Sequence, residues 1–353
     1  MANLSFRTSH RVKALGDGRS IVGSNTAGVG HYVQDAAQRL ELLNDILDGT
    51  LREEQVIEQI VERMELSLSE AEALLSTLIR LGHVELAAPS SLGLKEQERF
   101  SRSTALYSWL GGFGEFERWG PQESICTSRV CVLGAGGIGS NIAMQLVASG
   151  VGQITIVDFD AVELSNLNRQ LAYSEASIGK SKVLELKKRL TDINSDCNVV
   201  AIDRKIEGIS DLEDLFKMCD LVIRAIDSPP ESAYWVSSMA LEAEIPWIDC
   251  SYAGPMAVCA TFVPGVTGCY VCLRDNEHRR LSSENALGLF DEVPVGVNAA
   301  LAPIVSIAGS LATLEALRFL VSGKNFSMGK VLHQNLADYS NQYSIDIPSA
   351  CEH

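Results

Sequence analysis

The chain has 353 residues, enough for two domains, and its mix of 46% hydrophobic and 21% charged residues is typical of globular proteins. Its formal net charge is −16, which argues against nucleic-acid or anionic-membrane binding, because both need a basic face. Residues 1–16 lack the apolar core of a signal peptide, and Pro303, Glu315 and Arg318 interrupt the apolar stretch 299–320. We therefore expect a cytoplasmic protein in which that stretch is a buried helix rather than a membrane span.

Residues 1–87 predict a separate small domain. Short apolar alternations up to Val33 indicate one or two hairpins, and a further strand follows Gly82. Between them, apolar residues recur at helical spacing in three segments, which are Ala36–Leu47, Arg52–Met64 and Ser69–Leu81. This order of strands and helices is that of a winged helix.

Three functions are open for this domain. DNA binding is the usual one for a winged helix, but the third helix carries Glu70 and Glu72 and only Arg80 as a cation, a poor pattern for reading a groove. The element order also resembles the small peptide-clasp domains that recognise the leader of a ribosomally made peptide by adding it as a strand to a sheet edge. A packing or dimerisation domain is the third alternative.

Residues 88–128 have a mixed composition and are interpreted as a linker and dimer arm. From residue 129 to 353, strands alternate with helices, which predicts an α/β domain with a parallel-sheet core.

A glycine-rich turn opens this second domain. The apolar strand Val130–Leu133 runs directly into a turn and then into a helix, Ser140–Ala148. Glycines in such a turn let backbone N–H groups approach a phosphate at the helix N-terminus, and the acid that ends the next strand, Asp158, normally binds ribose hydroxyls. The sequence therefore predicts a Rossmann-like nucleotide site with its glycines at Gly134, Gly136, Gly137 and Gly139.

The polar residues after Asp158 indicate which nucleotide binds. The run contains Asp160, Asn166, Arg169 and Gln170, and Lys182 begins the next helix. An NAD-dependent oxidoreductase has no need for a guanidinium and an ammonium here, whereas a triphosphate that loses pyrophosphate does, because negative charge grows on the leaving group. We therefore expect ATP.

A second acid suggests a metal ion. The apolar strand that starts at Leu221 is predicted to end in Asp227, at the carboxyl edge of the sheet where ligands bind in such folds. A carboxylate that faces phosphates is explained by a bridging Mg²⁺.

These motifs together resemble the family that contains the ubiquitin-activating enzymes and the bacterial ThiF and MoeB adenylating proteins. The matching segments, over about residues 96–353, are Gly134–Gly139, Asp158–Val162, Ser165–Gln170, Gly179–Lys182, Asp227 and 302–317. The resemblance implies an adenylation domain with Asp158 on the ribose, Arg169 and Lys182 on phosphates, and Asp227 on Mg²⁺. It also implies a homodimer in which an upstream arginine, Arg102, reaches the partner's ATP.

The pair in Gly268-Cys-Tyr-Val-Cys272 is half of a zinc site by its spacing. The family's second half is usually a C-terminal Cys-x-x-Cys, but this chain ends in Cys351-Glu-His353. A structural Cys₃His zinc site from Cys269, Cys272, Cys351 and His353 is the hypothesis, and a metal-free packed pair is the alternative. Cys250 and Cys259 are expected in the core, and His278 in a solvated loop.

A transfer cysteine is missing from Leu273–Pro294, so a thioester route lacks its nucleophile. A peptide-clasp domain joined to such a core resembles the peptide-modifying branch of the family, which includes the microcin C and pantocin maturation enzymes. That resemblance implies ATP-dependent adenylation of a carboxylate in a ribosomally made precursor peptide, bound through its leader, followed by cyclisation or a related modification in antibiotic biosynthesis. The alternatives are a sulfur-carrier adenylyltransferase of thiamin or molybdopterin synthesis and a non-catalytic peptide-binding scaffold.

Overall fold

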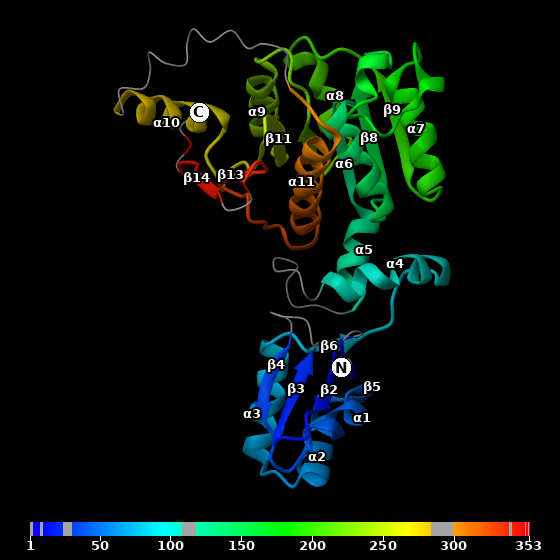
Figure 1. Cartoon of the computed structure of the whole chain (residues 1–353), viewed down its shortest axis with the longest axis vertical. Helices are drawn as coiled ribbons and strands as arrows, with labels where there is room; N and C mark the ends of the chain where they lie inside the picture. Colours follow the sequence, from blue (N-terminus) through cyan, green and yellow to red (C-terminus); the bar gives the residue numbers. More distant parts are fainter. Residues whose placement is uncertain are drawn as a thin grey trace. The chain divides into compact units, whose positions relative to one another are not determined.

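The computed structural model describes residues 3–7, 10–23, 30–107, 118–283, 299–338, 341–349, 351 and 353, with only the backbone described for 280–283. The chain divides into two compact units, Met1–Ser124 and Ile125–His353, whose placement relative to one another is not determined (Figure 1). Each unit is therefore described by itself.

The first unit contains two small antiparallel sheets among its described residues. One has the order β5-β1-β6, and the other has the order β2-β3-β4, so β4 lies at an edge. The strands are β1 (Asn3–Phe6), β2 (Arg11–Ala14), β3 (Arg19–Gly23), β4 (His31–Gln34), β5 (Asp48–Arg52) and β6 (Val84–Ala87).

Three helical segments pack on these sheets, near the predicted positions. Leu40–Leu42 is a 3₁₀ turn that leads into α1 (Leu43–Ile46), and α2 (Glu53–Met64) and α3 (Leu68–Arg80) follow. Ser67 caps α3 by accepting a hydrogen bond from the Glu70 backbone N–H, while the Glu70 carboxylate accepts one from the Ser67 N–H. Leu43, Ile46, Val56, Ile60 and Leu75 fill the core between helices and sheets.

The segment interpreted as a linker contains helices instead. Leu94–Tyr107 forms α4 and Gly120–Thr127 forms α5, while 108–117 lie outside the described residues. Phe100, Thr104 and Tyr107 are buried along one side of α4. The compact first unit extends to Ser124, well beyond residue 87, and so includes α4 and the first part of α5.

The second unit is built on a mostly parallel sheet, as predicted. Its described strands follow the order β14-β13-β12-β11-β10-β7-β8-β9, in which β11, β10, β7, β8 and β9 run parallel and the other three are antiparallel. The strands are β7 (Arg129–Leu133), β8 (Gln153–Asp158), β9 (Asn198–Asp203), β10 (Leu221–Arg224), β11 (Trp247–Ala253), β12 (Met256–Phe262), β13 (Lys330–Asn335) and β14 (Gln342–Asp346).

Helices cover both faces of this sheet. Successive side chains of β11 point to opposite faces of the sheet. Cys250 Sγ contacts the Ala308 carbonyl of α11 on one face. Asp249 lies on the other face, where Arg224 links it to Ser232 of α9. One group consists of α6 (Gly137–Ala148), α7 (Lys182–Ile193) and α11 (Ala302–Ser322), and the other of α8 (Glu213–Phe216), α9 (Ser232–Ala243) and α10 (Tyr270–Ser283) (Figure 1). Short 3₁₀ turns occur at Leu164–Asn166, Glu175–Ser177 and Ile209–Leu212.

Helix α11 occupies the predicted apolar stretch. It is long and apolar enough to cross a membrane by length and composition, but a core helix passes the same test. It packs against α6, β11 and β12, and Val305, Ala308, Ala312 and Ala316 along it are fully buried. The packing supports the expected core helix.

Candidate nucleotide and metal sites

The glycine-rich turn between β7 and α6 leaves no room for side chains at two positions. Gly134 has φ +104°, and a Cβ there would lie 2.6 Å from the Ala225 carbonyl oxygen. A Cβ on Gly139 would lie 2.0 Å from the Gly134 oxygen. The turn therefore keeps its backbone close to the loop after β10, and it leads into the N-terminus of α6, where backbone N–H groups favour an anion.

Two side chains hold Ala135 in this turn. Asp158 Oδ2 accepts a hydrogen bond from the Ala135 N–H (2.7 Å), and the Tyr173 hydroxyl donates one to the Ala135 carbonyl (2.7 Å). The other Asp158 oxygen accepts from the Asp160 N–H (2.8 Å). Burial raises the pKa of Tyr173 above its usual range, so the phenol stays a donor. Sequence reasoning found Asp158 but missed Tyr173.

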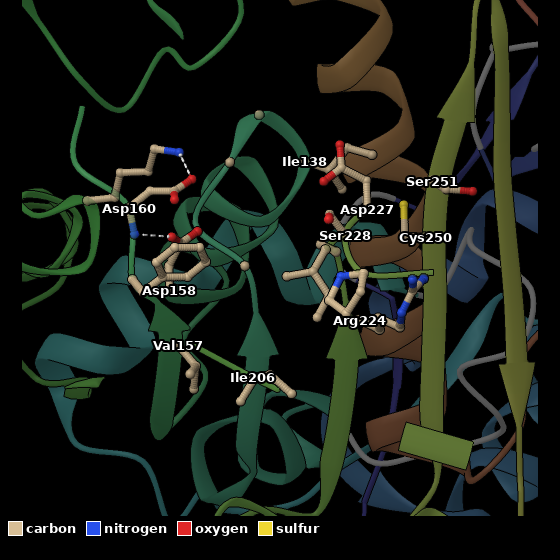
Figure 2. Close-up of a pocket in the computed structure, with 18 of the residues that line it drawn as sticks. Ile138, Val157, Asp158, Asp160, Ile206, Arg224, Asp227, Ser228, Cys250 and Ser251 are labelled. Carbon is tan, nitrogen blue, oxygen red and sulfur yellow. Dashed lines mark hydrogen bonds and ion pairs between the residues drawn. The ribbon is translucent and has the colours of Figure 1, made fainter. Parts of the chain in front are cut away.

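A cavity of about 880 Å³ opens above this turn, at the carboxyl ends of β8, β10 and β11 (Figure 2). Figure 2 shows Asp158 and Asp160 on one side of it and Asp227, Ser228, Cys250 and Ser251 on the other. The predicted residues that line the cavity are Gly134, Gly136, Gly137, Asp158, Asp160, Asn166, Arg169, Gln170, Lys182 and Asp227. Every predicted nucleotide-site residue of the second unit except Gly139, which lies in the turn beneath, thus shares one cavity.

Both predicted phosphate-binding cations line this cavity. Lys182 is buried, and its Nζ forms an ion pair with Asp160 Oδ2 at 2.7 Å. Arg169 donates from Nη1 to the Ser165 carbonyl (2.9 Å) and to Asn168 Oδ1 (3.0 Å). Arg169, in the loop after β8, is held by neighbours within four residues, whereas Lys182, at the start of α7, is held by an acid 22 residues earlier.

The residues present fit a nucleotide. Gln170 is 4% exposed, and its Oε1 is buried with no hydrogen-bond partner among the described residues. An acceptor left in this state indicates a donor that comes from a ligand or water. Asn166 is also buried, and its Oδ1 accepts from the Glu163 N–H (3.1 Å).

Asp227 differs from its predicted position. Strand β10 ends at Arg224, so Asp227 lies three residues beyond it in a loop rather than at the strand end. Its carboxylate is exposed to the cavity and makes no hydrogen bond or ion pair with the described residues. An acid with free oxygens beside the glycine-rich turn fits Mg²⁺, which prefers carboxylate and phosphate oxygens and would neutralise charge on the phosphates.

A buried arginine in the cavity wall was not predicted. Arg224 lines the cavity and is 7% exposed. It forms an ion pair with Asp249 Oδ1 at 2.7 Å, and its Nε and Nη2 donate to Ser232 Oγ. In the sequence Arg224 lies within an apolar strand. That position could have indicated a paired, buried arginine, because a charge buried in a strand needs a partner.

The predicted zinc ligands converge in the second unit. Cys269 Sγ lies 3.7 Å from Cys272 Sγ, and His353 Nδ1 lies 3.5 and 3.4 Å from these two sulfurs. Cys351 completes a group whose ligand atoms all lie within 4.8 Å of one another. Ligands about 2.3 Å from a tetrahedral zinc are about 3.8 Å apart, so the donor set and its spacing fit zinc.

The remaining predicted residues lie on helices and strands of both units. Arg102 is exposed on α4 of the first unit. Cys250 and Cys259 are buried on β11 and β12 as expected, although Cys250 also borders the cavity. His278 is exposed, but it lies on α10 rather than in a loop. Of the predicted loop Leu273–Pro294, residues 284–294 lie outside the described residues.

Sequence comparisons identify the relatives of this chain. Residues 102–349 match the ThiF family. The chain is 32% identical over 214 residues to the molybdopterin-synthase adenylyltransferase of Escherichia coli, a match that covers 60% of this chain and 80% of that protein. It is 31% identical over 150 residues to SUMO-activating enzyme subunit 2 of Dictyostelium discoideum, covering 42% of this chain but only 22% of that protein.

Structural comparisons extend over nearly the whole chain. The crystal structure of E. coli MccB with ATP has a TM-score of 0.78 at 22% identity and covers 99% of this chain and 98% of that one. A structure of PaaA has a TM-score of 0.70, also at 22% identity, and covers 96% and 98%. This likeness establishes the fold, while the sequence match establishes the family. The chain is therefore an ATP-dependent adenylating enzyme that belongs to the ThiF family.

Proposed function

We propose that this enzyme adenylates a carboxylate of a ribosomally made precursor peptide in antibiotic-type peptide biosynthesis. The observation that carries the proposal is that the likeness to MccB extends over the first unit as well as the second. The E. coli adenylyltransferase match covers 60% of the chain, whereas the MccB match covers 99% of it. One MccB structure is described as a complex of the microcin C7 biosynthetic enzyme with N-formylated MccA. The likeness supports a peptide as the partner here.

The proposed leader site is the edge strand β4, within the proposed recognition domain 1–87. All four β4 residues are exposed, including Tyr32 at 66%. The Asp35 N–H donates to the Gly18 carbonyl (2.8 Å), and hydrogen bonding alternates along antiparallel strands. The N–H and C=O groups of Tyr32 and Gln34 therefore point away from β3, where an added peptide strand would pair with them.

The proposed reaction uses the cavity of the second unit, within the proposed adenylation domain 129–353. A carboxylate oxygen of the peptide attacks the α-phosphorus of ATP, and the bond to pyrophosphate breaks. Arg169 and Lys182 stabilise the charge that grows on pyrophosphate, and Asp227 holds the Mg²⁺ that helps to neutralise it. A nitrogen of the same peptide then attacks the acyl carbon, loses its proton and releases AMP.

We also propose a homodimer with Arg102 acting in trans, with residues 88–128 serving as the dimer arm. Support comes from α11, where Ile304, Ile307, Leu311 and Leu314 form an apolar stripe at helical spacing that is only partly covered by the described residues. The proposed cytoplasmic location suits an enzyme that needs ATP and reduced thiols.

A sulfur-carrier adenylyltransferase is the second candidate, favoured by the 32% identity to the molybdopterin-synthase adenylyltransferase. ATP–pyrophosphate exchange separates the two. Peptides from short reading frames beside the gene should support exchange, and a folded carrier ending in Gly-Gly should not. The reverse result would replace the peptide proposal with the carrier proposal.

A backbone variant tests the leader site within the full chain. Tyr32→Pro removes one outward-facing N–H and leaves the β3–β4 pairing intact, because proline is tolerated where the N–H faces solvent. We expect the KM for the precursor to rise at least about tenfold, since main-chain pairing provides the affinity in strand addition. Tyr32→Ala is the matched control, in which only the side chain is lost. An unchanged KM in Tyr32→Pro would remove β4 from the leader site.

A further inference from the structure

Arg224 is held in the cavity wall by residues that stand behind it. It ends β10, and its register partner on the neighbouring strand β11 is Asp249. Nη1 donates to Asp249 Oδ1 at 2.7 Å, and Nε and Nη2 donate to Ser232 Oγ at 3.2 and 3.0 Å. Arg224 lines the cavity, whereas Asp249 and Ser232 do not. The guanidinium is thus presented to the cavity by a fixed support.

The guanidinium keeps hydrogen-bonding capacity after these contacts. Arginine has five N–H groups, and the bonds to Asp249 and Ser232 use three of them, which leaves two among the described residues. A buried donor without a partner is costly, so the remaining N–H groups need an acceptor when the cavity is occupied and dry. A planar group with two remaining donors matches a carboxylate better than a single carbonyl.

The position of Arg224 separates it from Lys182, one of the two cations assigned to phosphates. Figure 2 shows Arg224 on the same side of the cavity as Asp227 and Ser228, across from Asp158 and Asp160, the side assigned to the ribose. Lys182, on that ribose side, is ion-paired with Asp160. Arg224 instead faces the end of the sheet where β10 meets β11, away from the ribose position. Asp227, assigned to Mg²⁺, lies on this same side, so a carboxylate held by Arg224 would lie on the metal-bearing side of the cavity and away from the ribose.

We propose that Arg224, positioned by Asp249 and Ser232, binds the carboxylate of the acyl substrate and so determines that the enzyme accepts a free acid. This inference rests on the proposed function, because it names the contact that the substrate carboxylate makes in the same cavity. Arg224 holds the carboxylate before it attacks ATP, and no bond to Arg224 forms or breaks. Ser232 and Asp249 act through Arg224 as positioning residues.

The direct test uses a small carboxylate on the full-length enzyme saturated with α,β-methylene-ATP and Mg²⁺. Saturation-transfer NMR is recorded with N-acetyl-alanyl-alanine and, separately, with its C-terminal amide. We expect the wild type to bind the acid at least about tenfold more tightly than the amide, the size expected for charge-assisted hydrogen bonds. Arg224→Gln should bind the two ligands equally. Equal binding of acid and amide by the wild type, or an unchanged preference in Arg224→Gln, would overturn the proposal.

Three further variants distinguish recognition from a structural role. Arg224→Lys keeps the positive charge but loses the planar pair of guanidinium donors. Asp249→Asn keeps the guanidinium but weakens the contact that orients it. Both variants should therefore retain part of the preference for the acid. Arg129→Gln is the control, because it breaks an exposed arginine–aspartate pair of the same 2.7 Å length at the start of β7, between Arg129 and Asp220. It should keep the full preference. Its loss in Arg129→Gln would mean that any broken ion pair disturbs the cavity.

A kinetic arm separates this inference from the proposed function. In ATP–pyrophosphate exchange with a precursor that supports the wild type, Arg224→Gln should raise the KM for peptide at least about tenfold and change the KM for ATP less than about twofold. If no peptide supports exchange in the wild type, the peptide proposal fails while the NMR result still decides the role of Arg224. If exchange occurs and the ATP KM rises instead, Arg224 contacts the nucleotide.

Discussion

Nζ of Lys182 lies 2.7 Å from Oδ2 of Asp160, and the two side chains differ sharply in exposure, 6% against 47%. The lysine is thus buried in the cavity wall with its charge balanced by an acid that water can reach. A phosphate that binds here can replace Asp160 as the ion-pair partner of the Lys182 ammonium, because water can then solvate the Asp160 carboxylate. The pair sets Lys182 in place before ATP binds.

Lys182→Met should therefore impair catalysis more than it impairs folding. We expect exchange to fall about 10²- to 10³-fold, the usual cost of losing one group that stabilises transition-state charge. Asp160→Asn is the matched variant, which keeps the lysine but removes its partner, and it should lose much less. The measurement is pyrophosphate exchange beside thermal denaturation. A larger loss in Asp160→Asn than in Lys182→Met would show that the acid, not the lysine, does the essential work.

Asp227→Asn should remove most adenylation while the fold persists. The carboxylate makes no hydrogen bond or ion pair with the described residues, so Asp227→Asn leaves no buried partner behind, but the substitution removes the charged metal ligand. Exchange measured across a magnesium titration is the test. Near-wild-type exchange at every magnesium concentration would exclude Asp227 from the site. Asp203, exposed at the end of β9, provides a control substitution, Asp203→Asn, outside the cavity.

The trans arginine can be tested by mixing subunits. Neither Arg102→Ala nor Lys182→Ala homodimers should be active, but hybrids regain one intact site, so mixing should restore up to roughly a quarter of wild-type exchange. Arg99→Ala, one turn earlier on the same helix, is the control for Arg102→Ala and is mixed with Lys182→Ala in a parallel experiment. Absence of recovery, once subunit exchange is verified by mass spectrometry, would place Arg102 outside the partner's site.

The cluster Cys269, Cys272, Cys351 and His353 should hold about one zinc per chain. Cys351→Ser should lose most of this zinc and lower the melting temperature, because the metal joins the chain end to the start of α10. Cys126→Ser, in α5, is the control, because it removes a cysteine and leaves all four residues of the cluster in place. If elemental analysis finds no zinc in protein purified without chelator, the four residues do not form a zinc site and only pack against one another.

The local patterns were the most predictable part of this molecule. The turn Gly134–Gly139, the strand before it and Asp158 at the end of the next strand are close in sequence, and backbone sterics explain the need for glycine at Gly134 and Gly139. The grouping of the three cysteines and His353 was also predicted, although Cys272 and His353 are 81 residues apart, because these side-chain types indicate metal chemistry before the fold is known.

What escaped prediction depends on contacts that the sequence does not display. Arg224 acquires its role from Asp249, 25 residues later, and only the register of β10 on β11 brings them together. Tyr173 is similar, since its partner is a backbone carbonyl 38 residues earlier. Helix α4 was missed because its buried side holds only Phe100, Thr104 and Tyr107 among many polar residues, a weak periodic signal.

The last prediction concerns three histidines of the first unit. Nδ1 of His83 lies 3.1 Å from Nδ1 of His10, and its Nε2 lies 2.9 Å from Nδ1 of His31, so His83 links the other two rings. Burial, reinforced by neighbouring cations, lowers the pKa of His10 and of His83 to about 4. Both rings therefore stay neutral in the folded unit at neutral pH.

Because these pKa values are below the unfolded value near 6.5, the unfolded chain binds more protons between pH 6.5 and pH 4. The contribution of these two histidines to stability should be constant above pH 6.5 and fall progressively as the pH drops toward 4. Burial raises the pKa of Glu85, which opposes this trend at the acidic end, so wild type must be compared with a variant. His83→Gln keeps a polar side chain but cannot titrate, and its melting temperature should decline less between pH 6.5 and 4. Parallel melting curves for His83→Gln and wild type across that range would show that the histidine chain does not control the acid stability of the unit.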